Sequence, residues 1–122
     1  PLTPHGFIQA ASLADRFSAV KISKVYTSPL ERAISTALPL AEKCSAEISF
    51  DTLLLEKDVC ISHKGFSFSP ETESQCKERA RKFIESILDN HCNGAIAVVA
   101  HGEILQYLIR ESLGIADCSG RF

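Results

Sequence analysis

The feature that most constrains the fold is an uninterrupted apolar run from Ala95 to Ala100, which ends at His101-Gly102. A continuous apolar run of this kind is typical of a strand that is covered on both faces in a parallel sheet. A helical pattern follows from Glu103 to Leu113, and Gly114 is expected to end that helix. A buried strand that leads into a helix is the repeating unit of α/β folds, so the run points to that class.

The rest of the chain fits the same class. The expected helices cover about 4–17, about 28–43 and a stretch from about 69, and the expected strands cover 25–27 and 48–50. Residues 53–69 are expected to be irregular. Because strands and helices alternate, we predict a single α/β domain, residues 1–122, with a mostly parallel sheet flanked by helices. An open α/β sheet normally has a strand before its first helix, so a first strand is expected upstream of Pro1.

Local signals indicate where two of these helices begin. Ser28 and Glu31 have the S-x-x-E spacing of a capping box, and Pro29 is expected at the first helical position. Ser69-Pro70 is likewise interpreted as a helix cap followed by a proline. Pro39 lies inside the second helix and should kink it, because proline removes an N–H group there. The helix after Ser69 carries an apolar stripe of Cys76, Ala80, Phe83, Ile84, Ile87 and Leu88.

The composition excludes several classes of function. Thirteen basic and 15 acidic residues give a formal charge of −2, so the chain lacks the basic surface that nucleic acids and anionic membranes require. No apolar run approaches the ~20 residues of a membrane span. The five cysteines form no C-x-x-C pair, which argues against a zinc site or a disulfide scaffold. We therefore expect reduced thiols and a cytoplasmic protein; the oligomeric state cannot be inferred.

Two expected strand ends carry residues suited to binding phosphate. The strand at 25–27 leads into the helix that holds Arg32. The apolar run is followed directly by His101 and by the N–H of Gly102. In open α/β sheets, ligands bind beyond the carboxyl ends of the strands. Arginine presents a planar fork to phosphate oxygens, and helix N-termini favour anions. If the two strands are neighbours, these groups converge on one phosphate site, although singly Arg32 also fits a solvated surface charge.

Motifs of competing chemistries are absent from the sequence. It contains no G-x-x-x-x-G-K-[ST] loop, no G-x-G-x-x-G and no G-x-S-x-G elbow. No cysteine is followed six positions later by arginine, as a cysteine phosphatase would require. His63 and His91 lack ligand spacing and are interpreted as surface residues. No metal or other cofactor is expected, since histidine, arginine and backbone donors already match a phosphoryl charge.

Several stretches together resemble the histidine phosphatase superfamily, also called phosphoglycerate-mutase-like. They are Pro1 to Ala10 (L-T-x-x-G-x-x-Q-A), Thr27 to Ala37 (S-P-L-x-R-A-x-x-T-A), Leu55-Glu56, Glu73-Ser74 with Arg79 (E-[ST]-x(n)-R), and Val98 to Gly102. These matches follow the order of the family. The resemblance implies the phosphoglycerate-mutase-like fold. It also implies that the substrate of this protein is a phosphorylated small molecule or a phosphoprotein.

The resemblance also implies a mechanism. In this family a histidine of an N-terminal R-H-G motif attacks phosphorus, and water hydrolyses the resulting phosphohistidine. Here His101 would hydrogen-bond the phosphoryl group, Arg32 would bind its oxygens, and Glu56 would protonate the leaving oxygen and later activate water. Taken without the resemblance, Glu56 fits better as the polar residue that ends a buried strand.

The R-H-G motif itself is not in this sequence. Pro4-His5-Gly6 resembles it, but it has no arginine and no preceding strand, so His5 is not expected to be the nucleophile. We expect the nucleophilic histidine upstream of Pro1, in a phosphomonoester phosphatase. The alternatives are a non-catalytic module that binds a phosphorylated ligand, a phosphoglycerate mutase, and an α/β domain without a phosphate site.

Overall fold

The structure, a computed structural model, describes residues 3–17, 21–62, 65–90 and 95–113. The predictions for His63, His91 and Gly114 lie outside these ranges. The chain forms two compact units. The first unit comprises Pro1–Thr52 and Cys92–Val99, and the second comprises Leu53–His91 and Ala100–Phe122. Within the described residues, no helix is both long enough and apolar enough to cross a membrane.

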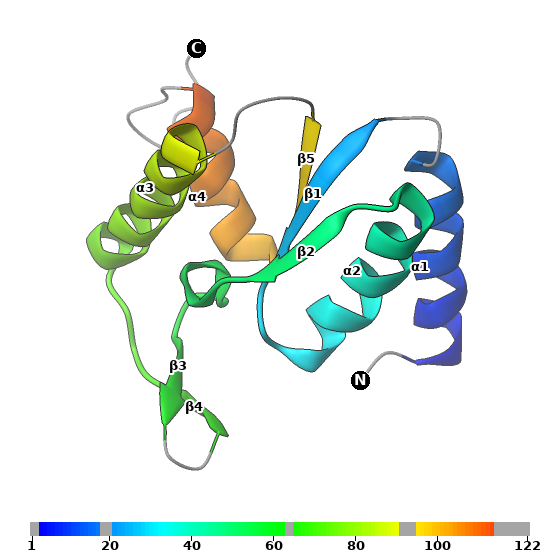
Figure 1. Cartoon of the computed structure of the whole chain (residues 1–122). Coiled ribbons are helices and arrows are strands. Elements are labelled where there is room, and N and C mark those ends of the chain that lie inside the picture. The colour runs from blue at the N-terminus through cyan, green and yellow to red at the C-terminus, as the bar shows by residue number, and fades with distance from the viewer. Residues whose placement is uncertain (1–2, 18–20, 63–64, 91–94, 114–122) are drawn as a thin grey trace. The chain divides into compact units, whose positions relative to one another are not determined.

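The first unit is a parallel sheet with helices on it (Figure 1). Its elements are α1 (Pro4–Phe17), β1 (Ile22–Thr27), α2 (Glu31–Cys44), β2 (Glu47–Phe50) and β5 (Ala95–Val99). The strand order is β2-β1-β5, and both pairings are parallel. Val25 in the central strand is aligned with Ile48 on one side and Ala97 on the other. The predicted α/β class with a parallel sheet is confirmed.

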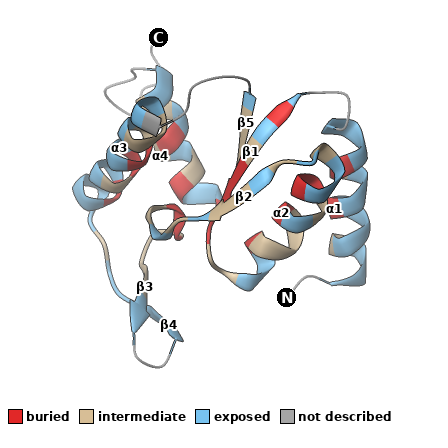
Figure 2. Ribbon diagram, in the orientation of Figure 1, coloured by how far each residue is buried: buried red, intermediate tan, exposed pale blue. Residues whose placement is uncertain are grey.

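The core of the first unit forms between β1 and α2 (Figure 2). The buried cluster consists of Ile22, Val25, Ala37, Leu40 and Ala41. The helix α1 packs against α2 through Ala10 and Ala14, its two buried residues, because small side chains allow close approach. β5 is an edge strand of the described sheet, and its residues 96–99 are half-buried rather than fully covered as expected.

The predicted start of α2 is wrong. The helix begins at Glu31, and its N-cap residue is Leu30, which has no side-chain cap. Ser28 instead continues the sheet, since its backbone N–H donates to the Val99 carbonyl at 3.0 Å. Its buried Oγ accepts the N–H of Leu30 at 3.3 Å, so neither the capping box nor a helical Pro29 forms. The helix runs through Pro39 without interruption.

The second unit combines a hairpin and two helices. Its elements are a 3-10 turn (Thr52–Leu54, shared with the first unit), β3 (Val59–Ser62), β4 (Gly65–Phe68), α3 (Glu73–Asn90) and α4 (Gly102–Leu113). The strands β3 and β4 pair antiparallel. The prediction that residues 53–69 are irregular is therefore wrong. The helices α3 and α4 pack side by side (Figure 1).

Two predictions for α3 need correction. The helix begins at Glu73, and its capping box is formed by Thr72 and Gln75 rather than by Ser69-Pro70. The N–H of Gln75 donates to Thr72 Oγ1 at 3.1 Å, and the N–H of Thr72 donates to Gln75 Oε1 at 2.9 Å. Of the predicted stripe, Cys76, Ala80 and Phe83 are completely buried, whereas Leu88 is 74% exposed. Leu88 is five positions beyond Phe83, about 140° around the helix.

Candidate active site

The carboxyl end of the first unit's sheet leads directly to Arg32. The Thr27 carbonyl accepts the N–H of Asp51 at 3.0 Å, and Ser28 is bonded to Val99, so the ends of all three strands are tied together. Arg32 follows as the second residue of α2. Its side chain is exposed and makes no hydrogen bond or ion pair with another described residue. Among the described residues, the guanidinium therefore stays unengaged, and its binding of an anion stays a prediction.

The start of α4, in the second unit, carries the other predicted residues. The His101 carbonyl accepts the N–H of Leu105 at 2.9 Å, which makes His101 the N-cap residue of the helix. His101 is only 8% exposed. Gly102 is the first helical residue, and a Cβ placed on it would meet nothing within 4 Å. Within the described residues, packing does not require glycine there.

Glu56 binds this helix start through its side chain. Its Oε1 accepts the N–H of Ile104 at 3.0 Å, and its Oε2 accepts the N–H of Glu103 at 3.3 Å. Oε1 also accepts the N–H of Lys57 at 3.0 Å. A helix N-terminus favours a negative charge, and these bonds satisfy two of its unpaired donors. The structure thus brings Glu56 next to the turn that begins with His101, while Arg32 belongs to the other unit and its meeting with His101 stays a prediction.

The second unit also contains an ion pair that the sequence analysis did not identify. Arg79 bonds to Glu71 through Nε to Oε2 at 2.7 Å and Nη2 to Oε1 at 2.8 Å. Hydrogen bonding from Arg79 holds the pKa of Glu71 below its usual value, against the effect of burial. The resemblance had matched Arg79 with Glu73, which is exposed at the first turn of α3. The partner lies before the helix, eight residues from the arginine.

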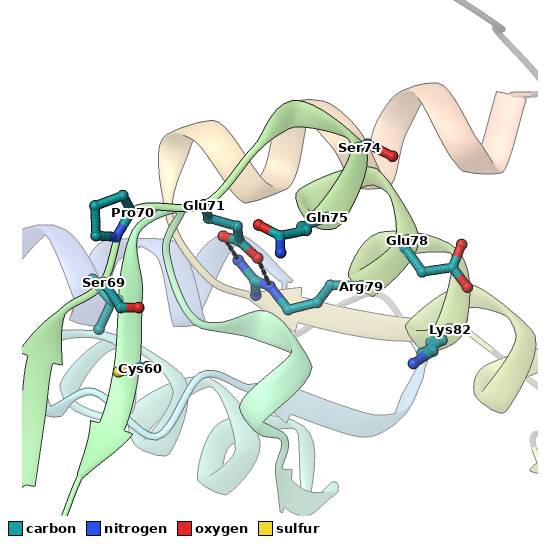
Figure 3. A pocket seen from close by; sticks show the side chains of 10 residues that line it. Cys60, Ser69, Pro70, Glu71, Ser74, Gln75, Glu78, Arg79 and Lys82 are labelled. Carbon is teal, nitrogen blue, oxygen red and sulfur yellow. Dashed lines mark hydrogen bonds and ion pairs between the residues drawn. The ribbon is translucent and has the colours of Figure 1, made fainter.

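This ion pair forms part of the wall of a cavity of about 560 Å³ (Figure 3). Ser69 and Pro70 line one side of it, and Gln75, Glu78 and Lys82 of α3 line the other. Nearby Cys76 is fully buried, and burial raises its thiol pKa to about 11. Among the described residues, no three His, Cys, Asp or Glu side chains form a group that could hold a metal ion.

Comparison with known proteins gives consistent matches. The sequence model of the histidine phosphatase superfamily, branch 1, matches residues 1–120. A candidate phosphoserine phosphatase 2 of Hydrogenobacter thermophilus is 28% identical, and the match covers 93% of this chain and 67% of that protein. A probable phosphoglycerate mutase of Klebsiella pneumoniae is also 28% identical, over 94% of this chain and 64% of that protein. The chain thus spans about two thirds of the length of these relatives.

A solved structure has the same fold. The phosphoserine phosphatase of Entamoeba histolytica, crystallised in complex with 3-phosphoglyceric acid, superposes with a TM-score of 0.73. The sequences are 19% identical, and the match covers 93% of this chain and 68% of that one. The likeness confirms the predicted phosphoglycerate-mutase-like architecture.

Proposed function

The chain belongs to the histidine phosphatase superfamily, and we propose that it provides most of the active site of a phosphomonoester phosphatase that works through a phosphohistidine. Its homologues include proteins named as phosphoserine phosphatases and phosphoglycerate mutases. We propose a phosphorylated small molecule as the substrate, because the solved relative was crystallised with such a compound. A phosphoprotein remains the alternative substrate class.

One observation carries the proposal: the Glu56 carboxylate is held against the start of α4, next to His101. A phosphatase needs donors for the phosphoryl oxygens and a group that exchanges a proton with the leaving oxygen. Here His101 and the Gly102 N–H supply donors, and Glu56 supplies the proton-transfer group from the same unit. Arg32 would bind phosphoryl oxygens from the first unit.

The hydrogen bonds suggest which oxygen of Glu56 transfers the proton. Oε1 accepts two N–H groups at 3.0 Å, whereas Oε2 accepts one at 3.3 Å. We therefore assign the transferred proton to Oε2. In the first step it passes to the leaving alcohol oxygen as the phosphorus–oxygen bond breaks. In the second step Oε2 takes a proton from the water that attacks the phosphohistidine, which restores the starting state.

The proposal requires a nucleophilic histidine in an R-H-G motif, which we place upstream of Pro1. His5 does not fit this role, since it is an exposed residue in the first turn of α1 rather than the residue at the end of a strand. The gene sequence upstream of Pro1 provides a direct check. The chain extended by those residues should form an acid-labile phosphohistidine when incubated with labelled 3-phosphoglycerate or phosphoserine.

Two measurements on the extended chain separate the alternatives. Release of inorganic phosphate supports the phosphatase, and conversion of 3-phosphoglycerate to its 2-phospho isomer supports the mutase that the Klebsiella relative suggests. Binding of vanadate without either reaction supports a non-catalytic module. His101→Ala should abolish turnover with little loss of thermal stability. A variant that melts early yet retains full activity would show that His101 is only a helix cap.

We also propose a reducing compartment, the cytoplasm, for this protein. Cys44, Cys60 and Cys76 are free thiols, and each of the three belongs to a different helix or strand. Mass spectrometry of the protein isolated from its source under alkylating conditions should find these three unoxidised.

A further inference from the structure

All three nitrogens of the Arg79 guanidinium donate hydrogen bonds to residues of the second unit. Besides its two bonds to Glu71, Nη1 donates to the carbonyls of Leu53 at 2.9 Å and Leu55 at 2.7 Å. These carbonyls flank the completely buried Leu54, and the second one immediately precedes Glu56. The arginine, on α3, therefore fixes the backbone that enters Glu56.

Glu71 fixes the backbone that leaves Glu56. The N–H of Glu71 donates to Asp58 Oδ1 at 2.7 Å, and the N–H of Asp58 donates to Glu71 Oε1 at 3.3 Å. The Asp58 carbonyl also accepts the N–H of Ser69 at 2.7 Å. Asp58 has a positive φ of 69°, so the chain turns sharply there before β3 begins. The Arg79–Glu71 ion pair thus bonds to the chain both before and after Glu56.

The pair is enclosed enough to act as a rigid support. The side chains of Arg79 and Glu71 are 19% and 15% exposed, and they meet in a two-bond fork that restricts rotation (Figure 3). By contrast, Arg81 pairs with Glu78 and Glu85 on the exposed surface of the same helix. Arg81 contacts no residue of the 53–58 segment in these bonds, so it provides a matched control.

We propose that Arg79, supported by Glu71, is the positioning residue for Glu56: it sets the carboxylate against the N–H groups of Glu103 and Ile104. The consequence for catalysis rests on the function proposed above, but the placement of the carboxylate does not. The competing explanation is that the ion pair only anchors α3, in which case its loss would loosen the whole second unit evenly.

Amide hydrogen exchange separates these explanations without any turnover. In α4 the first-turn amides of Glu103 and Ile104 bond to Glu56, so their protection reports directly on its placement. In Arg79→Lys, exchange at these two amides should quicken about tenfold, the factor expected for one charged hydrogen bond. The amide of Phe83, in the middle of α3, should change less than about twofold. Arg81→Lys should alter none of them, and Glu56→Gln gives the scale of the full response.

Two results would overturn the proposal: equal acceleration at Phe83 and at the α4 amides, or unchanged protection at Glu103 and Ile104. If Arg79→Lys does not fold, Glu71→Gln replaces it, because that variant keeps the arginine but loses the charge that orients it. The same pattern of exchange is expected there.

Kinetics of the extended chain then test the catalytic consequence. Arg79→Lys should lower kcat about tenfold and leave KM nearly unchanged, because Arg79 is not expected to touch the substrate. If the exchange response appears but the extended chain forms no phosphohistidine, the positioning role stands and the proposed function fails. If the extended chain turns over and Arg79→Lys changes neither exchange nor kcat, the positioning role fails and the proposed function stands.

Discussion

The Oε1 atom of Glu56 accepts the backbone N–H of Ile104 at 3.0 Å, although the two residues are 48 positions apart in the sequence. The carboxylate completes the N-terminus of α4. Its second role, proton transfer beside His101, is the one that we propose. Any substitution of Glu56 must separate these roles before its effect on activity can be interpreted.

Glu56→Ala should lower the free energy of unfolding by about 1 kcal/mol, because the first turn of α4 loses its acceptor. Glu56→Gln keeps an acceptor oxygen and should recover much of that stability, yet it cannot transfer the proton. Urea unfolding and turnover of both variants check this. A glutamine variant as active as the parent would remove Glu56 from the mechanism.

Arg32→Ala should weaken the binding of vanadate or inorganic phosphate, with a loss of about 1.5–3 kcal/mol for a charged hydrogen bond. The melting temperature should not change, since the Arg32 side chain is exposed and has no partner among the described residues. Arg16→Ala, which removes the same charge from the exposed last turn of α1, is the control. Early melting with unchanged anion affinity would make Arg32 a structural residue.

Phe83→Ala should destabilise the protein by about 3–5 kcal/mol, because the ring is completely buried and its loss leaves a cavity. Leu88→Ala on the same helix should change stability by less than about 0.5 kcal/mol, since that side chain is 74% exposed. Thermal or urea unfolding of the two variants makes the comparison. Similar losses would mean that another part of the protein covers Leu88.

The sequence was sufficient for the elements whose apolar pattern is long. The helix over 4–17 and the strand at 95–99 occur where periodicity predicts them. The hairpin β3–β4 is not predicted, because each of its strands is only four residues long. Phe66 and Phe68 alternate with small or polar residues, but so short a run does not distinguish a strand from a loop.

The local signals for helix starts were less reliable, for a physical reason. A cap depends on where the backbone leaves the preceding element, and Ser28 was still bonded to the sheet. The contact between Glu56 and α4 could not be predicted from spacing, because it depends on tertiary packing. The bond between Arg79 and Glu71 could not be predicted for the same reason, since Glu71 lies before the helix that holds the arginine.

The ion pair between Arg79 and Glu71 should make part of the stability depend on pH. The pKa of Glu71 is lowered in the folded chain from its usual 4.5, and the hydrogen bond from Arg79 is the largest cause. A carboxyl group with a lowered folded pKa contributes its full stabilisation above the unfolded pKa. That contribution should be lost as the pH falls below about 4.5 and through the lower folded pKa.

Glu71→Gln isolates this contribution. At pH 7 the variant should be less stable than the parent by about 1.5–3 kcal/mol, the range for hydrogen bonds to charged groups. The difference should shrink steadily below pH 4.5, because the protonated glutamate then resembles glutamine, whereas carboxylates that do not interact with Glu71 contribute equally to both proteins and cancel. Urea unfolding between pH 7 and about pH 3 measures it, with the exposed Glu73→Gln as control. A difference that stays constant over this range would show that the charge of Glu71 does not stabilise the fold, and the support assigned to Glu56 would then have to come from Arg79 alone.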